Sequence, residues 1–131
     1  MIIITFGTFD IIHVGHLHML KNTKILDGIN KIIIGVCSDE LYHKLHGDYP
    51  INNQKDRLSI LQSFTFIDQV FIENVSDKRY ELIIKYKADL LIASDKWEGK
   101  LDHFKQYCDV KYFKKIPDAS KEKLIEKIKN T

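Results

Sequence analysis

The chain has 131 residues and a mass of 15.4 kDa, the size of one folding domain. Hydrophobic residues make up 44% and charged residues 29%, which excludes collagen and argues against a disordered chain or a coiled coil. Lys and Arg number 20 against 18 Asp and Glu, and the resulting net charge of +2 gives no indication of nucleic-acid binding.

The cysteines and the apolar segments bear on location. Cys37 and Cys108 are too few for a disulfide framework and belong to no CxxC pair, so we expect a reducing cytoplasm. The apolar start at residues 1–6 lacks the basic residues of a signal peptide, and no apolar run approaches the ~20 residues that cross a bilayer. We therefore expect no membrane association.

Short β-branched runs alternate with segments of helical period. The runs that predict strands are residues 2–6, 32–36, 70–72, 90–93 and 110–113. Helical stripes begin at Met19, Leu58, Tyr80 and Leu124, the first of them continuing through Thr23 to Leu26. This order predicts a single α/β, Rossmann-like domain over residues 1–131, with a five-stranded parallel sheet and helices on both faces.

Ligands of such sheets bind beyond the carboxyl ends of the strands. The connections that follow the strands are therefore the expected location of the site, and we interpret them as loops: residues 7–15, 38–52, 73–77, 94–99 and 114–120.

The first connection carries the strongest motif, Gly-Thr-Phe-Asp at residues 7–10 and His-Val-Gly-His at residues 13–16. Gly7 allows a sharp turn and a close approach of the backbone to a ligand, and Gly15 does the same where the helix begins. A helix N-terminus offers unpaired N–H groups, and imidazoles three residues apart can donate to the same phosphoryl group. The motif therefore favours phosphate binding.

Two other interpretations of these histidines remain open. In the first interpretation, His13 and His16 are ordinary surface or core residues. In the second, they join Asp10 and His18 as metal ligands. A closed zinc site requires four ligands, and a helix that begins at a glycine between the two histidines fits phosphate better.

The two motifs resemble the signature of the cytidylyltransferase-like nucleotidyltransferases. Residues 95–102, Asp-Lys-Trp-Glu-Gly-Lys-Leu-Asp, are similar to a stretch of the glycerol-3-phosphate branch of that family, and residues 38–40, Arg57 and residues 67–70 also correspond. The resemblance implies transfer of CMP from CTP to a small phosphorylated polyol, with glycerol 3-phosphate favoured and pyrophosphate released. Alternatives are another acceptor (phosphoethanolamine, a sugar phosphate or another anion), ATP as donor, or a non-catalytic nucleotide-binding module.

The resemblance also assigns roles to residues. It implies catalysis by His13 and His16, nucleotide binding by Gly7, Thr8, Phe9, Gly15, Asp95, Lys115 and Ser120, and acceptor binding by Lys44, Arg57 and Arg79. A solvated lysine and an exposed helical arginine are the competing interpretations of Lys44 and Arg57. The family further implies Mg²⁺ that arrives with the triphosphate, no metal site of the chain itself, and a homodimer without nucleic-acid or membrane partners.

The last connection departs from the family pattern. Residues 115–121 read Lys-Ile-Pro-Asp-Ala-Ser-Lys where the family has Arg-Thr-x-Gly-Ile-Ser-Thr. Lys115 keeps the charge of the arginine but loses its bidentate fork, and Asp118 can cap the final helix. Lys114 and Lys121 add positive charge, and Thr65 stands where the glycerol-3-phosphate branch usually has an arginine. These departures leave the acceptor and the activity open.

Overall fold

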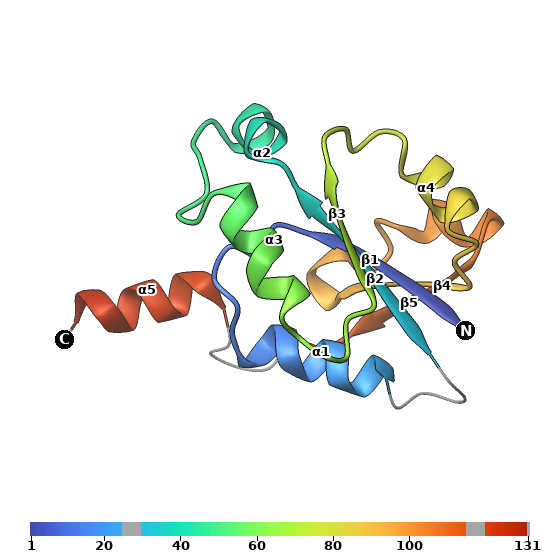
Figure 1. The fold of residues 1–131 in the computed structure, drawn as a ribbon, viewed down its shortest axis with the longest axis horizontal. Helices are drawn as coiled ribbons and strands as arrows, with labels where there is room; N and C mark the ends of the chain where they lie inside the picture. Colours follow the sequence, from blue (N-terminus) through green and yellow to red (C-terminus); the bar gives the residue numbers. More distant parts are fainter. Residues whose placement is uncertain (25–29, 115–119, 131) are drawn as a thin grey trace.

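The structure, a computed structural model, describes residues 1–24, 30–114 and 120–130. Its elements in chain order are β1 (Ile2–Gly7), α1 (Val14–Lys24), β2 (Lys31–Cys37), α2 (Asp39–His46), α3 (Gln54–Gln62), β3 (Gln69–Glu73), α4 (Arg79–Lys85), β4 (Leu90–Ser94), the short 3₁₀ helices η1 (Asp95–Trp97) and η2 (Asp102–Gln106), β5 (Asp109–Phe113) and α5 (Lys121–Lys129). The strands form one parallel sheet in the order β3-β2-β1-β4-β5 (Figure 1). The predicted α/β fold with a five-stranded parallel sheet is confirmed.

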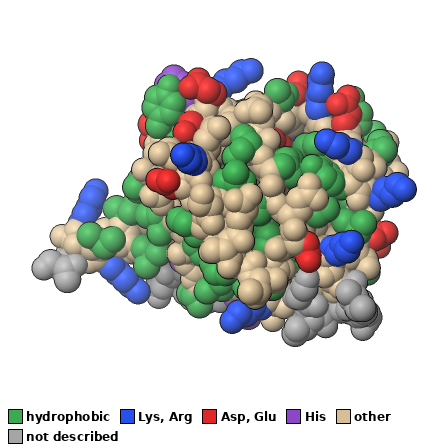
Figure 2. Space-filling model, in the orientation of Figure 1, with side chains coloured by type: hydrophobic (Ala, Val, Ile, Leu, Met, Phe, Trp, Pro, Cys, Tyr) green, Lys and Arg blue, Asp and Glu red, His purple; other side chains and the backbone are tan. Residues whose placement is uncertain are grey.

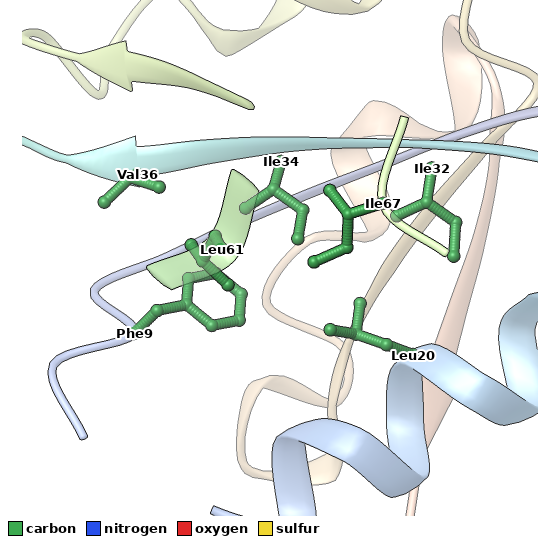
Figure 3. Packing of buried hydrophobic residues seen from close by; sticks show 7 residues of the cluster. All are labelled: Phe9, Leu20, Ile32, Ile34, Val36, Leu61 and Ile67. Carbon is green, nitrogen blue, oxygen red and sulfur yellow. The ribbon is translucent and has the colours of Figure 1, made fainter. Parts of the chain in front are cut away.

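Helices cover both faces of the sheet, as the continuously apolar strands predict. Alternate residues of a strand point to opposite faces. Ile32, Ile34 and Val36 of β2 therefore pack with Leu20 of α1 and Leu61 of α3 (Figure 3). On the other face the buried cluster joins Ile4, Ile33 and Leu91 of the sheet to Ile83 of α4 and Phe104 of η2.

The prediction of a loop over residues 38–52 is wrong, because it contains α2. Ser38 caps this helix through its Oγ, which accepts from the amide of Leu41, and Gly47 ends it in the left-handed region at φ 85°. Leu41 is the one buried residue of α2, so the helix packs only a short apolar face against the protein. Its signals are its caps.

Two of the other helical stripes extend beyond the helices that contain them. Phe64 and Ala88 follow the ends of α3 and α4, and Leu26 lies outside the described residues. Within the part of the chain that the structure describes, no helix has the length and hydrophobicity that crossing a membrane requires.

Arg57 of α3 holds together the chain segments that frame the carboxyl edge of the sheet. Its side chain has 0% exposure, and Nη2 forms an ion pair with Oδ1 of Asp39 at 2.8 Å. The guanidinium also donates to the backbone oxygens of Thr8 (2.8 Å), Cys37 (2.7 Å) and Asn52 (2.9 Å). One buried cation thus fixes the loop after β1, the end of β2 and the start of α3.

We predict that Arg57→Lys destabilises the protein by about 3 kcal/mol, because an ammonium cannot satisfy three buried carbonyls and a carboxylate at once. Urea unfolding followed by circular dichroism measures this free energy. Lys55→Met on the exposed surface of the same helix is the matched control and should change stability by less than about 0.5 kcal/mol. Equal stability of Arg57→Lys and the wild type would contradict the role of the guanidinium.

Candidate active site at the carboxyl ends of β1 and β4

The strand order places the candidate site. In the sheet, β1 lies between β2 and β4, and the chain order reverses at the β1–β4 neighbours. Such a switch point leaves a crevice beyond the carboxyl ends of the two strands. The loop after β1 carries the His-x-Gly-His motif, and the loop after β4 begins with Asp95 in η1. These two segments, far apart in the sequence, meet at one edge of the sheet.

The structure brings His13 and His16 together at the N-terminus of α1. His13 directly precedes the helix and His16 lies in its first turn, and their ring centroids are 3.9 Å apart. The amide of Gly15 donates to Nδ1 of His13 at 3.1 Å, and the amide of His13 donates to Nδ1 of His16 at 3.3 Å. A backbone amide can only donate, so both Nδ1 atoms accept. Each ring therefore carries its proton on Nε2 and is a neutral hydrogen-bond donor.

Electrostatics favour the same neutral form. Burial, the adjacent His13 and the positive charge of Lys96 together lower the pKa of His16 to about 4. An imidazolium would also place a second proton on Nδ1, against the amide that donates to that atom. His16 is therefore neutral at pH 7 and donates from Nε2.

Gly7 has a packing role in the first loop. Among the described residues, positive φ falls on Phe9 (50°) in this loop and not on Gly7. A Cβ atom on Gly7 would lie 2.9 Å from the Phe9 ring, which packs in the core beside Leu61. Gly7 therefore makes room for Phe9. The Phe9 ring lies beside Leu61 (Figure 3) and anchors the loop that carries the histidines.

Asp10 fastens the same loop to the segment before α3. Its carboxylate accepts from the amides of Ile51 (2.8 Å) and Asn52 (2.7 Å), and its backbone oxygen accepts from the Asn52 side chain. Burial acts to raise the pKa of Asp10, but the two amides and the ammonium of Lys121 outweigh burial and lower it. Asp10 is therefore a charged structural anchor.

This geometry does not support the metal interpretation. Asp10 is occupied by backbone amides, and His18 faces Asn22 on α1, with 2.9 Å between His18 Nε2 and Asn22 Nδ2. In residues 1–24, 30–114 and 120–130, no three His, Cys, Asp or Glu side chains are grouped so that they could hold a metal ion.

The other residues expected to bind the nucleotide are Thr8, Asp95, Ser120 and Lys115. Thr8 borders the site, with its backbone oxygen bound to Arg57, and Asp95 begins η1 after β4. Ser120 is the N-cap of α5, where its Oγ accepts from the amide of Lys123 at 3.1 Å. Its hydroxyl hydrogen is still able to donate to a phosphate. Lys115 and the expected capping residue Asp118 lie outside the described residues.

The expected acceptor residues lie toward β2 and β3. Lys44 is exposed on α2. Arg79 forms a bidentate pair with the buried Glu73 at the end of β3, at 2.8 and 2.9 Å, and its guanidinium lies 4.7 Å from the Phe6 ring centroid. Arg57, for which an exposed position was the competing interpretation, is instead enclosed by the protein and presents no surface to an acceptor.

Thr65, where the family branch usually has an arginine, lies away from this edge. It is exposed in the turn between α3 and β3, before the amino end of the strand. The site lies beyond the carboxyl ends of the sheet. Within one chain, the replacement of that arginine by Thr65 therefore removes no positive charge from this site.

The sequence assigned no role to Lys96 or Glu73. Lys96 follows Asp95 after β4, and its charge acts on His16 because β4 lies beside β1. Glu73 ends β3, one strand beyond β2, and neutralises Arg79. Both residues lie at or just after the carboxyl end of a strand. This position indicates a role only when the strand order is known.

Comparisons with known proteins agree with this geometry. The family described as Cytidylyltransferase-like matches residues 4–126. Glycerol-3-phosphate cytidylyltransferase of Bacillus subtilis (strain 168) is 29% identical over 126 residues, which cover 96% of this chain and 95% of that protein. A solved structure of the lipopolysaccharide core biosynthesis protein from Thermoplasma volcanium GSS1 has the same fold, with a TM-score of 0.67, 24% identity, and coverage of 88% of this chain and 96% of that one.

Other relatives have names that indicate different functions. FAD synthase of Pyrococcus abyssi (strain GE5 / Orsay) is 40% identical over 85 residues, which cover 65% of this chain and 56% of that protein. The bifunctional protein HldE of a Nitratiruptor species is 41% identical over 100 residues, which cover 76% of this chain and 21% of that protein. The match over residues 4–126, together with the paired histidines at the β1–α1 junction, shows that the chain belongs to the cytidylyltransferase-like family.

Proposed function

We propose that this nucleotidyltransferase transfers CMP from CTP to glycerol 3-phosphate or a similar small phosphorylated polyol and releases pyrophosphate. The observation that carries the proposal is the pair of adjacent imidazoles at the N-terminus of α1, each with Nδ1 bound to a backbone amide. The similarity to glycerol-3-phosphate cytidylyltransferase over nearly the whole chain supports CTP and the polyol phosphate as substrates.

The chemistry requires positioning and charge stabilisation. The second pKa of a phosphomonoester is about 6, so the acceptor is a dianion at neutral pH and needs no general base. Its oxygen forms a bond to the α-phosphorus as the bond from that phosphorus to the β-bridging oxygen breaks. The Nε2–H groups of His13 and His16 donate to oxygens of the triphosphate and stabilise the charge that develops there.

The proposal includes Mg²⁺ that arrives with the triphosphate. The described part of the chain has no grouping of three candidate ligands, which fits an ion held by phosphate oxygens and water and not a cage of protein side chains. When bound, such an ion neutralises phosphate charge, and no step of the proposal is assigned to it.

On the acceptor side the proposal assigns phosphate contacts to Lys44 and Arg79. Glu73 already occupies two N–H groups of Arg79, so this arginine brings little net charge and contributes mainly an oriented donor. Exposed Lys44 supplies the mobile positive charge. The proposal gives Arg57 no contact with the acceptor, since its guanidinium holds the wall of the site.

A matrix of CTP, ATP, GTP and UTP against glycerol 3-phosphate, phosphoethanolamine and sugar phosphates tests the function. Pyrophosphate release is the readout, with each triphosphate alone as the control for hydrolysis. We expect the largest kcat/KM for CTP with glycerol 3-phosphate. Turnover with ATP alone among the donors would move the protein to adenylyl transfer. Nucleotide binding without turnover in any pair would identify a non-catalytic module.

We predict that His16→Ala lowers kcat roughly 10²–10³-fold, the usual cost of losing one donor to developing negative charge. Steady-state kinetics with the best substrate pair measures the effect. His18→Ala is the matched control, because His18 lies on the same helix and faces Asn22. The circular dichroism spectrum of both variants should match the wild type, and an unchanged kcat in His16→Ala would remove this residue from the mechanism.

The lowered pKa of His16 also predicts how stability depends on pH. The unfolded chain binds this proton near pH 6.5 and the folded chain near pH 4. Between these values the unfolded state binds more protons, so stability rises with pH and falls on acidification. Urea unfolding at pH 4.5, 5.5 and 7 should show a steeper loss for wild type than for His16→Ala. Parallel curves would contradict the neutral state of His16.

The proposal keeps Lys115 as a ligand of the triphosphate. If its ammonium donates to a charged oxygen, Lys115→Ala should weaken nucleotide binding by about 1–3 kcal/mol, and Lys115→Arg should retain or improve binding. Isothermal titration with CTP measures both, with Lys127→Ala on α5 as the control for the loss of one positive charge. Equal affinity in wild type and Lys115→Ala would exclude this lysine from the site.

We also propose that the protein is a homodimer and is located in the cytoplasm. A homodimer is supported by the family resemblance, and light scattering at several protein concentrations tests it. Cytoplasmic location is supported by Cys37 and Cys108, which are both free thiols.

A further inference from the structure

The ammonium of Lys121, the first residue of α5, joins three segments. Its Nζ lies 3.2 Å from Oδ2 of Asp10 in the loop after β1. It also lies 3.5 Å from the hydroxyl of Tyr42 on α2 and 5.6 Å from the centroid of the same ring. We call this arrangement of Asp10, Tyr42 and Lys121 the lysine clasp.

The Asp10 side of the clasp is shielded from water and has a low dielectric constant. The Asp10 side chain is 2% exposed and that of Lys121 is 23% exposed. The two backbone amides that bind Asp10 carry no net charge, so Lys121 is the cation that neutralises this carboxylate. The carboxylate and the tyrosine in turn raise the pKa of Lys121 against the opposing effect of burial. A partly buried pair of this kind is stronger than a solvated surface pair.

The rest of α5 is weakly attached to the protein. Figure 1 shows the helix extending away from the sheet, and Figure 2 shows hydrophobic and lysine side chains exposed along it. None of its residues is buried, Ile128 is 71% exposed, and the buried clusters of the described residues include no residue of α5. Apolar burial therefore contributes little to the position of this helix, and the contact at its first residue matters correspondingly more.

We propose that Lys121 is a positioning residue, which holds the N-terminus of α5 against the loop that carries His13 and His16 so that the helix can receive the triphosphate. This inference rests on the proposed function. Ser120, whose Oγ caps α5, immediately precedes the clasp, so a shift of Lys121 moves the hydroxyl and the first amides of the helix together. Since Tyr42 belongs to α2, the clasp also ties the nucleotide side of the site to the helix that bears Lys44.

Hydrogen exchange of the α5 amides tests the clasp without requiring turnover. The variants are Lys121→Met, which removes the charge, and Lys121→Arg, which can restore the ion pair. Lys123→Met is the matched control, because its side chain is exposed on the same helix and pairs with Glu126, at 3.9 Å. We expect exchange about tenfold faster in Lys121→Met, with Lys121→Arg and Lys123→Met near wild type. Unchanged exchange in Lys121→Met would overturn the clasp.

Titration and kinetics test its role in the site. With CTP, Lys121→Met should raise the dissociation constant and the KM of the nucleotide about tenfold, Lys121→Arg should recover most of the loss, and the KM of the acceptor should change less. Faster exchange in α5 with unchanged nucleotide binding would overturn the positioning role.

A double-mutant cycle with Asp10→Asn separates positioning from direct phosphate binding. If Lys121 acts through Asp10, Lys121→Met should weaken nucleotide binding far less in the Asp10→Asn background. An undiminished loss there would make Lys121 a phosphate ligand and overturn the inference. Failure of wild-type protein to bind any triphosphate would defeat the proposed function and the role in nucleotide binding, whereas the exchange experiment judges the clasp by itself.

Discussion

The burial of one guanidinium determines much of this structure. Parallel strands bring their carboxyl ends, with backbone oxygens that the ladder does not pair, to a common edge of the sheet. Arg57 stabilises this geometry by donating to the oxygens of Thr8, Cys37 and Asn52, and Asp39 balances its charge. Without that cation the same oxygens would be buried and unpaired, which costs more than exposing them to water. The edge that carries the site is therefore rigid before any ligand arrives.

The loop that carries His13 and His16 is held in place by the same kind of buried contact. Arg57 fixes Thr8, the ring of Phe9 is held in the core through the space left by Gly7, and Asp10 is fastened to residues 51 and 52. The chain then enters α1 with amides directed at both Nδ1 atoms, so the tautomer of each imidazole is set by the backbone. A site built in this way requires little reorganisation as charge develops on a phosphoryl group.

The charges around the site are mostly paired within the protein. Arg79 is paired with Glu73, Arg57 with Asp39, and Lys121 with Asp10. These cations hold the elements around the site, and in the proposed function the neutral N–H donors of the histidines have a large part in recognising phosphate. Under the proposed function, this division is compatible with the small net charge of +2.

The sequence by itself determined the strand segments and the motif, because both are local patterns. Continuous apolar runs such as residues 32–36 identify strands covered on both faces, and the spacing of His13 and His16 places two imidazoles at one helix N-terminus. Tertiary structure decided what depends on distant segments. The strand order brought the charge of Lys96 to act on His16. Burial made Arg57 a structural cation in place of the expected ligand. The fold also paired Lys121 with Asp10, 111 positions away in the chain. The physical reason is that a side chain's charge acts on whichever partner the fold brings within a few ångströms, and no pattern of neighbouring residues specifies that partner.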